Sequence, residues 1–471
     1  MGSSEALSLL RKIYKYAMVS NHLPYPDEHP LYNCPTMDLH MDNGHMNLLR
    51  DAPASIQSSS SFIDAIPTEI LLLVFEEYCY SGDALKGLKP PQLVITHVCH
   101  YWRTVALSCT TLWSALDISP QTSLDMIAIY LQRSGDLPLS LQVDLRHDVS
   151  DPSTHEHVMS TWNTIKSTAS RWRRLHIQVG PQDAISVSNN LRQVDSPVLE
   201  ELRMTSVSHV PGLANMFEGG TPALKTLSLV GISLLQFAPP LQKLTRLHLT
   251  SNVSTSYETF WELLSKMTQL EELTLHSRVV SSWPIQPSLA KNITLPSLRT
   301  FKLSDQRCPL FVPLLSIAAP LLHTLCLSDL VVHDLPEASS ESRIREYYPS
   351  VRNLVLNGVA SFIDGVSFSQ LTRIFPAVDH LSIVDVDPYF VRQSCEALHD
   401  PTIWPKLQTF TISPSLLDED IFCSLLAART TKSVKTALQT VIIPTRIHFT
   451  KLDWIIRNVN LVLAGEPISR S

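Results

Sequence analysis

The chain has 471 residues, of which 44% are hydrophobic and 17% charged, and its formal net charge at pH 7 is −7. This length exceeds one ordinary hydrophobic core, so we expect several units or an elongated array of repeats. The acidic balance and the lack of a basic block disfavour sequence-independent binding to nucleic acid. The most apolar stretch, residues 310–322, is too short to cross a membrane and contains Pro313 and Pro320, so no membrane partner is expected.

Residues 1–60 show no sustained hydrophobic period and are rich in Pro, Asp, His and Ser. Segments of this kind bury too little apolar surface to order, so we expect a poorly ordered N-terminal tail. The first residues lack the apolar core of a secretory signal peptide. Eight cysteines are scattered along the chain without a Cys-x-x-Cys pair, which is typical of reduced thiols in a cytoplasmic or nuclear protein.

Two helical patterns follow this tail. After Ile66 and Pro67, apolar residues recur at offsets of 0, 1, 4, 5 and 8, which places them on one face of a helix: Ile70, Leu71, Val74, Phe75 and Tyr78. Proline suits the first turn of such a helix because its missing N–H would be unpaired there anyway. After a loop between Tyr80 and Gln92, a second apolar face is formed by Val98, Cys99, Trp102, Val105 and Ala106. The segment ends with Leu112 and Trp113.

The order and spacing of these two motifs resemble an F-box, and most closely the F-box family expanded in mushroom-forming fungi. The resemblance covers residues 62–116 and departs from the usual pattern at Ile66, where the family has Leu, and in the long loop. It implies a helical F-box domain over residues 61–117 that binds a Skp1-type scaffold protein. The residues implied in this contact are Ile66, Pro67, Ile70, Leu71, Val74, Val98, Cys99 and Trp102. Some of them also have to hold the module together, and a small helical cap on the rest of the chain is the alternative.

A second pattern, apolar-x-x-apolar-x-apolar, recurs eleven times from residue 172 onward. Successive units begin between 20 residues (Leu224 to Leu244) and 31 residues (Leu407 to Leu438) apart, which is the period of leucine-rich repeats. The units begin at Trp172, Leu199, Leu224, Leu244, Leu270, Leu298, Leu322, Val351, Val378, Leu407 and Leu438. Two earlier matches, at Trp113 and Pro138, extend the array towards the F-box.

Each unit predicts a short strand, because its last two apolar residues lie two apart and share one face. Helical spacing between strands predicts helices over residues 257–267, 390–398 and 421–428. No unit can bury its leucines alone, so the units are expected to stack. We therefore expect an α/β fold: a small helical F-box module, then an irregular leucine-rich-repeat-like solenoid with a C-terminal cap over residues 118–471, its curved parallel sheet inside and its helices outside. The alternative is a non-repeating, leucine-rich α/β domain.

The side chains that alternate with the buried ones should face the concave side of the sheet. These positions are mostly small and polar, with mixed charge, and suit a protein or peptide partner. The partner-binding residues expected there are Arg246, His248, Thr274, His276, Thr300, Lys302, Asn353 and His380.

The sequence contains none of the common catalytic motifs, so we expect no enzyme, no cofactor and no metal site. The best candidate cluster comprises Asp144, His147, Asp148, Asp151, His155 and His157. We interpret it as a polar loop that leads into a helix N-terminus, where Asp and Thr are favoured.

The resemblance and the repeats together predict a substrate-recognition adaptor of a Skp1-cullin-F-box type ubiquitin ligase, in which the solenoid binds an unknown protein substrate. One alternative is a repeat-based interaction protein without a ligase role. A second is a metal-dependent enzyme that uses the residues between Asp144 and His157.

Overall fold

The computed structural model describes fifteen parts of the chain: residues 66–80, 90–147, 152–206, 215–237, 241–250, 254–284, 291–305, 309–329, 335–358, 365–386, 388–414, 418–430, 438–443, 449–463 and 466–467. The predicted tail over residues 1–60 lies outside them. The chain divides into two compact units, one of Met1–Ala115 with Ala128–Leu137 and one of Leu116–Ile127 with Pro138–Ser471. The boundary predicted at residues 117 and 118 falls inside a strand, Ala115–Ile118.

The first unit is helical. Its elements are α2 (Thr68–Tyr80), α3 (Pro91–Thr96), α4 (His100–Ser108), the 3₁₀ turn η1 (Thr110–Trp113) and the C-terminal part of α5 (Leu124–Arg133). The core is aromatic: the rings of Phe75 and Trp102 meet edge to face with centroids 4.9 Å apart, and both side chains are fully buried. Trp113 is equally buried and donates from Nε1 to the Ala106 carbonyl oxygen at 2.9 Å. These three side chains fix the helices against one another.

The second predicted helix is divided. Residues 91–96 form α3, and α4 begins only at His100, so Val98 and Cys99 lie in the connection and not on a helix face. Cys99 is extended and its Sγ accepts from the Trp102 amide at 3.4 Å, as an N-cap does. Arg103 reaches back from α4 and donates from Nε to the Thr96 carbonyl oxygen at the end of α3, at 2.8 Å. The apolar period alone did not reveal this break, because Val98 still lies inside the core.

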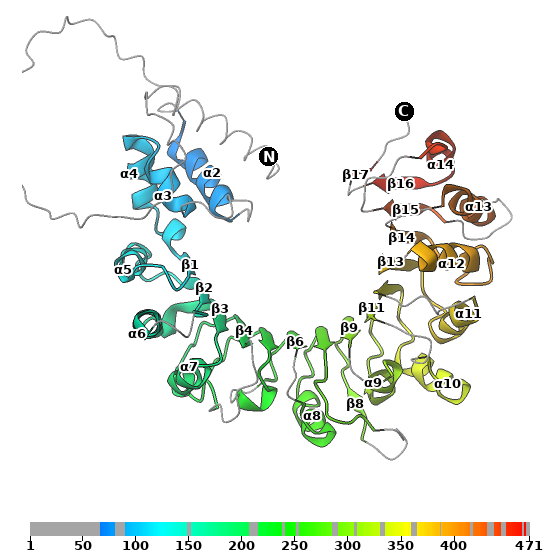
Figure 1. The fold of residues 1–471 in the computed structure, drawn as a ribbon, viewed down its shortest axis with the longest axis horizontal. Helices are drawn as coiled ribbons and strands as arrows, with labels where there is room; N and C mark the ends of the chain where they lie inside the picture. Colours follow the sequence, from blue (N-terminus) through cyan, green and yellow to red (C-terminus); the bar gives the residue numbers. More distant parts are fainter. Residues whose placement is uncertain are drawn as a thin grey trace, which may run out of the picture. The chain divides into compact units, whose positions relative to one another are not determined.

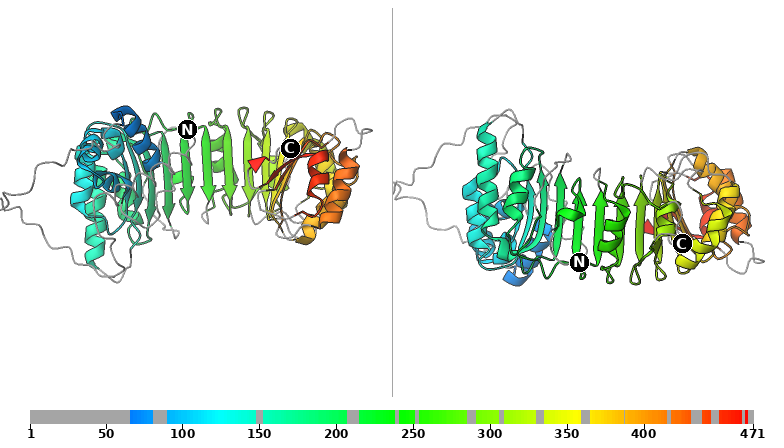
Figure 2. Two further views of the ribbon diagram at one scale, coloured as in Figure 1. Left: turned by 90° about the horizontal axis from the view of Figure 1, so that it is seen from above. Right: turned by 90° about the horizontal axis from the view of Figure 1, so that it is seen from below.

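The second unit contains a 15-stranded sheet whose strands follow in chain order. The strands are β1 (Ala115–Ile118), β2 (Leu139–Asp144), β3 (Trp172–Val179), β4 (Glu201–Ser206), β5 (Thr226–Val230), β6 (Arg246–Thr250), β7 (Glu272–His276), β9 (Thr300–Ser304), β11 (Thr324–Ser328), β12 (Asn353–Asn357), β13 (His380–Val386), β14 (Thr409–Pro414), β15 (Thr440–Ile443), β16 (Asn460–Leu463) and β17 (Glu466–Pro467). Every pairing described from β2 to β16 is parallel, and β17 pairs antiparallel with β16. Figure 2 shows these strands side by side.

Helices connect the strands on one face of the sheet. They are α6 (Pro152–Lys166), η2 (Ala169–Arg171), α7 (Ala184–Leu191), η3 (Leu234–Gln236), α8 (Tyr257–Leu264), α9 (Phe311–Ser316), α10 (Ala338–Tyr347), α11 (Gly365–Ile374), α12 (Pro388–Leu398), α13 (Glu419–Thr430) and α14 (Leu452–Asn458). Within this unit the helices cover the convex side and the strands line the concave side (Figure 1). The shortest repeat, from Leu224 to Leu244, has room only for the three-residue η3 between its strands.

The predicted repeat is confirmed at all eleven positions, because each triplet ends in a strand of this sheet. The two earlier matches also become strands, β1 and β2. Along the array the central residues of the triplets pair in register, as Leu273 with Phe301 and Phe301 with Leu325, and all three are fully buried. The predicted helices over residues 257–267, 390–398 and 421–428 correspond to α8, α12 and α13. The α/β solenoid predicted from the sequence is therefore present.

Among the described residues, four strands lie outside the predicted pattern: β8, β10, β16 and β17. β8 (Ile293–Thr294) and β10 (Ile317–Ala318) form a separate two-stranded parallel pair. Each has only two residues, which is too short to give a hydrophobic period. β16 adds one more parallel strand after the last predicted triplet.

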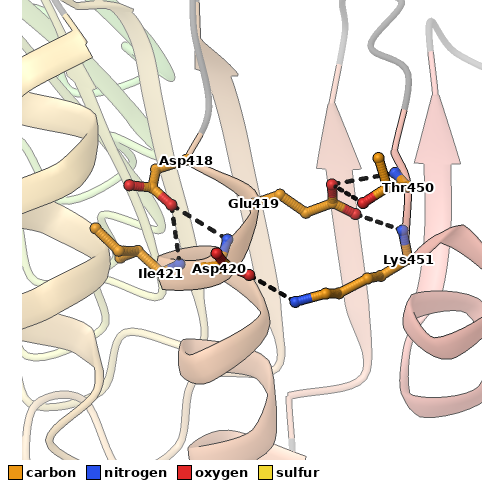
Figure 3. A network of polar contacts seen from close by, with 6 residues as sticks. All are labelled: Asp418, Glu419, Asp420, Ile421, Thr450 and Lys451. Atoms are coloured by element: carbon orange, nitrogen blue, oxygen red, sulfur yellow. Dashed lines mark hydrogen bonds and ion pairs between the residues drawn. The ribbon is translucent and has the colours of Figure 1, made fainter.

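Polar contacts fasten the last two repeats to each other. The Glu419 carboxylate, at the start of α13, accepts from the Thr450 hydroxyl at 2.6 Å and from the backbone amides of Thr450 and Lys451 at 3.1 and 2.6 Å (Figure 3). Asp420 pairs with the Lys451 ammonium at 2.5 Å. Asp418 caps α13 by accepting from the amides of Asp420 and Ile421. These contacts compensate for the backbone donors at the ends of α13 and α14.

None of the helices in the described ranges combines the length and the apolar character needed to cross a membrane.

Candidate functional site

The outer face of α2 carries an apolar stripe. Pro67, Ile70 and Leu73 lie three residues apart, so they share one side of the helix. Ile70 is 51% exposed and Leu73 is 62% exposed. Tyr101 of α4 holds the start of the helix, because its hydroxyl donates to the Ile66 carbonyl oxygen at 3.1 Å. The stripe is therefore presented by a fixed helix rather than by a loose segment.

The structure separates the residues implied by the F-box resemblance into two groups. Pro67 and Ile70 are exposed, and Ile66, Val74 and Cys99 are half-buried. In contrast, Leu71 and Trp102 are each 1% exposed and Val98 is buried, so these three pack in the core of the module. Leu73 was missed, because it lies outside the apolar period at offsets 0, 1, 4, 5 and 8.

The concave face is the second candidate surface. None of the eight residues predicted there is buried: Arg246, His248, Thr274, His276, Thr300, Lys302, Asn353 and His380. Each alternates with fully buried neighbours on its strand, as the two-residue period requires. The structure thus confirms their orientation, and partner binding by these residues stays a prediction.

Charge is divided unevenly along this face. From β3 to β9 it carries four cationic residues, Arg174, Arg203, Arg246 and Lys302, against two acidic ones, Glu201 and Glu272. From β11 to β16 no Lys, Arg, Asp or Glu is present among the inner-face side chains that the structure describes. The face therefore has a net cationic stretch followed by an uncharged one.

Both acidic residues of the cationic stretch are already paired. Glu201 accepts from Arg203 at 2.7 Å and lies 3.1 Å from His176 Nε2, while Glu272 pairs with Lys302 at 2.6 Å. Arg246, between Thr226 and Glu272 in register, forms no ion pair with the residues that the structure describes. Its charge is available to a partner.

His248 lies in the middle of this stretch. Its pKa is held below the usual value by burial and then by the nearby His276 and Lys302. The Nε2 atom of His248 lies 3.0 Å from the Thr250 hydroxyl. The excess positive charge around it favours a partner with acidic or phosphate groups.

Only some members of the polar cluster between Asp144 and His157 lie close together in the structure. Asp144 forms an ion pair with Arg146, which donates to both carboxylate oxygens at 2.8 and 2.6 Å. These hydrogen bonds lower the pKa of Asp144. His157 lies 3.0 Å from the Thr122 carbonyl oxygen, away from the other members. Asp148 and Asp151 lie outside the described residues. His147 and His155 do come together, but around Asp183 of the next repeat.

A scan of the sequence against models of known protein families gives no match, and a search of curated proteins gives none either.

Proposed function

We propose that the chain is an adaptor whose helical module docks on a Skp1-type scaffold protein and whose solenoid binds a protein substrate for ubiquitin transfer. The observation that carries this proposal is the exposed stripe of Pro67, Ile70 and Leu73 on α2. Neighbouring exposed apolar side chains on one helix face are typical of a site where a partner docks. The F-box resemblance of residues 62–116 supplies the identity of that partner.

The packing of the module supports docking as a rigid body. Phe75, Trp102 and Trp113 are fully buried in its core, on the side of α2 away from the stripe. Preorganised apolar side chains on a helix lose little conformational entropy when they bind a groove. Ile70 and Leu73 are therefore the residues expected to contribute most to the contact, with Pro67 beside them.

The concave face of the solenoid supports the second half of the proposal. The solenoid offers a long surface of small polar side chains, and the stretch from β3 to β9 has excess positive charge around Arg246. Such a surface suits an extended protein segment that carries acidic or phosphorylated side chains. The uncharged stretch from β11 to β16 can contact less polar parts of the same partner.

Scaffold binding is tested by mixing the purified full chain with a purified Skp1-type scaffold protein and separating the mixture by gel filtration. The proposal expects a stable complex with one copy of each chain. Separate elution of the two proteins at micromolar concentrations would contradict the scaffold role and favour a repeat protein that binds partners without a ligase.

Substrate binding is tested by comparing the proteins captured by the wild-type chain with those captured by Arg246→Glu. Arg392→Glu, on the outer helix α12, is the matched charge-reversal control. A subset of captured proteins should be lost with Arg246→Glu and retained with the control. Identical captures by all three would place the substrate site elsewhere.

A further inference from the structure

His147, His155 and Asp183 converge at the N-terminal end of the solenoid, although they come from three segments. His147 follows β2, His155 lies in the first turn of α6, and Asp183 precedes α7. Their potential ligand atoms all lie within 4.8 Å of one another. The Nδ1 atoms of His155 and His147 lie 2.9 and 3.3 Å from the two carboxylate oxygens of Asp183.

Asp183 is the unusual member of this cluster. It is completely buried, and among the described residues these two imidazole nitrogens are the partners of its carboxylate oxygens, which accept no other hydrogen bond. It occupies the N-cap position of α7, yet its side chain accepts no hydrogen bond from that helix. An Asp at this position ordinarily accepts from the helix amides. Here the carboxylate is instead directed towards the two imidazoles.

A buried carboxylate is strongly destabilising unless hydrogen bonds or a positive charge compensate it. A divalent cation held between the three side chains would supply that charge, with the two imidazoles as its nitrogen ligands. The Nδ1 atom of His147 also lies 3.2 Å from the Leu145 carbonyl oxygen.

The donor set indicates the class of metal. Two imidazole nitrogens and one carboxylate oxygen are typical ligands of Zn²⁺ and related transition metals, whereas Mg²⁺ and Ca²⁺ prefer oxygen. Ligand atoms of a tetrahedral zinc site are about 3.3 Å apart, given bond lengths near 2.0–2.1 Å. The two histidine-to-carboxylate distances are 2.9 and 3.3 Å, each to a different oxygen of Asp183, and one ligand atom from each residue lies within 4.8 Å of the others. The side chain of His155 is half-exposed, so it can adjust its position on binding a metal.

We propose that His147, His155 and Asp183 form a binding site for a divalent transition metal of the zinc class. The metal fastens two successive repeats, since His147 and His155 belong to the β2–α6 repeat and Asp183 to the β3–α7 repeat. A direct contact between the same segments, from Gln182 Nε2 to the His147 carbonyl oxygen, is long at 3.4 Å. Ligands from neighbouring repeats make the metal part of the interface on which a solenoid depends.

The test uses the full chain without a histidine tag, stripped of metal with a chelator. Zn²⁺ binding is measured by calorimetry, Co²⁺ binding by its visible absorption, and thermal stability is recorded with and without each metal. The variants are His155→Gln and Asp183→Asn. The control is His157→Gln, which lies on the same helix but contacts Thr122 instead of the cluster.

Wild type and the control should bind Zn²⁺ and Co²⁺ at one common saturable site and melt at a higher temperature when loaded. Mg²⁺ and Ca²⁺ should give neither effect. Both variants should lose at least about tenfold in affinity for that site and the associated thermal shift. The proposal is overturned if wild type shows no such site, or if both variants bind as tightly as wild type. His155→Gln decides the question alone if Asp183→Asn does not fold, because His155 is half-exposed.

Discussion

Thr324 and Leu325 are neighbours in β11, yet their side chains lie on opposite faces of the sheet. Leu325 is fully buried and pairs in register with Phe301 and Leu354. Thr324 is only partly buried, on the inner face. This alternation is repeated along the array and explains how one sheet provides both the core and an accessible inner face.

Leu325→Ala should therefore lower the free energy of unfolding by ~2–5 kcal/mol, through lost burial and an incompletely collapsed cavity. Thr324→Ala should change it by less than about 0.5 kcal/mol, as surface substitutions usually do. Denaturant unfolding of both variants measures the difference. Equal losses at the two positions would contradict the strand register.

Arg429 should be a critical residue of the C-terminal repeats. It is buried, burial lowers its pKa to about 10, and its guanidinium donates to the carbonyl oxygens of Leu398, Asp400, Ile403 and Trp404. Arg429→Met should destabilise the protein by at least about 3 kcal/mol, because several buried acceptors lose their donor.

Arg429→Lys should restore little of this loss, because an ammonium cannot reproduce the planar fork of the guanidinium. Arg392→Met is the control: Arg392 is exposed and pairs with Glu396 on the same helix. Urea unfolding should separate the two sites clearly. A stable Arg429→Met protein would show that the loop over residues 398–404 does not depend on this guanidinium.

The contact of Glu419 with Thr450 and Lys451 should make stability depend on pH. Hydrogen bonds, first of all from the Thr450 hydroxyl, lower the pKa of Glu419 in the folded protein. The folded state thus favours the ionised carboxylate, so the stabilisation is present above the unfolded pKa of about 4.3 and is lost as pH falls through the lower folded value.

This dependence is measured by comparing wild type with Glu419→Gln in urea at several pH values. Wild type should be the more stable protein at neutral pH, and the difference should shrink as the pH falls below about 4. A difference that is independent of pH would mean that the charge of Glu419 does not contribute.

Much of the fold could be predicted because each repeat of the solenoid carries the same short pattern of apolar residues. Each triplet, such as Leu322, Leu325 and Leu327, specifies a strand with its buried face, and stacking needs no further information. The turn after the strand is also repeated: Gly231, Asp329 and Gly358 each follow a strand with positive φ. At Gly231 a Cβ atom would lie 2.4 Å from the Ser206 carbonyl oxygen, so the close approach of neighbouring repeats requires glycine there.

The sites were less predictable, because they depend on contacts between segments. The apolar face predicted for α2 includes both Ile70 and Leu71, but tertiary packing buries only Leu71. Asp183 carries no local signal that would link it to His147 and His155, since it belongs to the next repeat. The second predicted helix is interrupted because Cys99 is the N-cap of α4. The spacing of apolar residues gives no sign of such a cap.

The adaptor hypothesis depends on one helix face. Leu71→Asp would place a charge in the core and unfold the module, so it cannot test docking. Ile70→Asp with Leu73→Asp changes only exposed side chains. Leu235→Asp, in a residue of the solenoid that is 49% exposed, is the matched control for an added surface charge.

The most direct measurement is calorimetric titration of a purified Skp1-type scaffold protein into the full chain and these two variants. Wild type and Leu235→Asp should bind equally well. The Ile70→Asp/Leu73→Asp variant should lose at least about thirtyfold in affinity, equivalent to ~2 kcal/mol for a central interface residue, while its circular dichroism stays that of wild type. Scaffold binding by this folded variant with wild-type affinity would contradict the account.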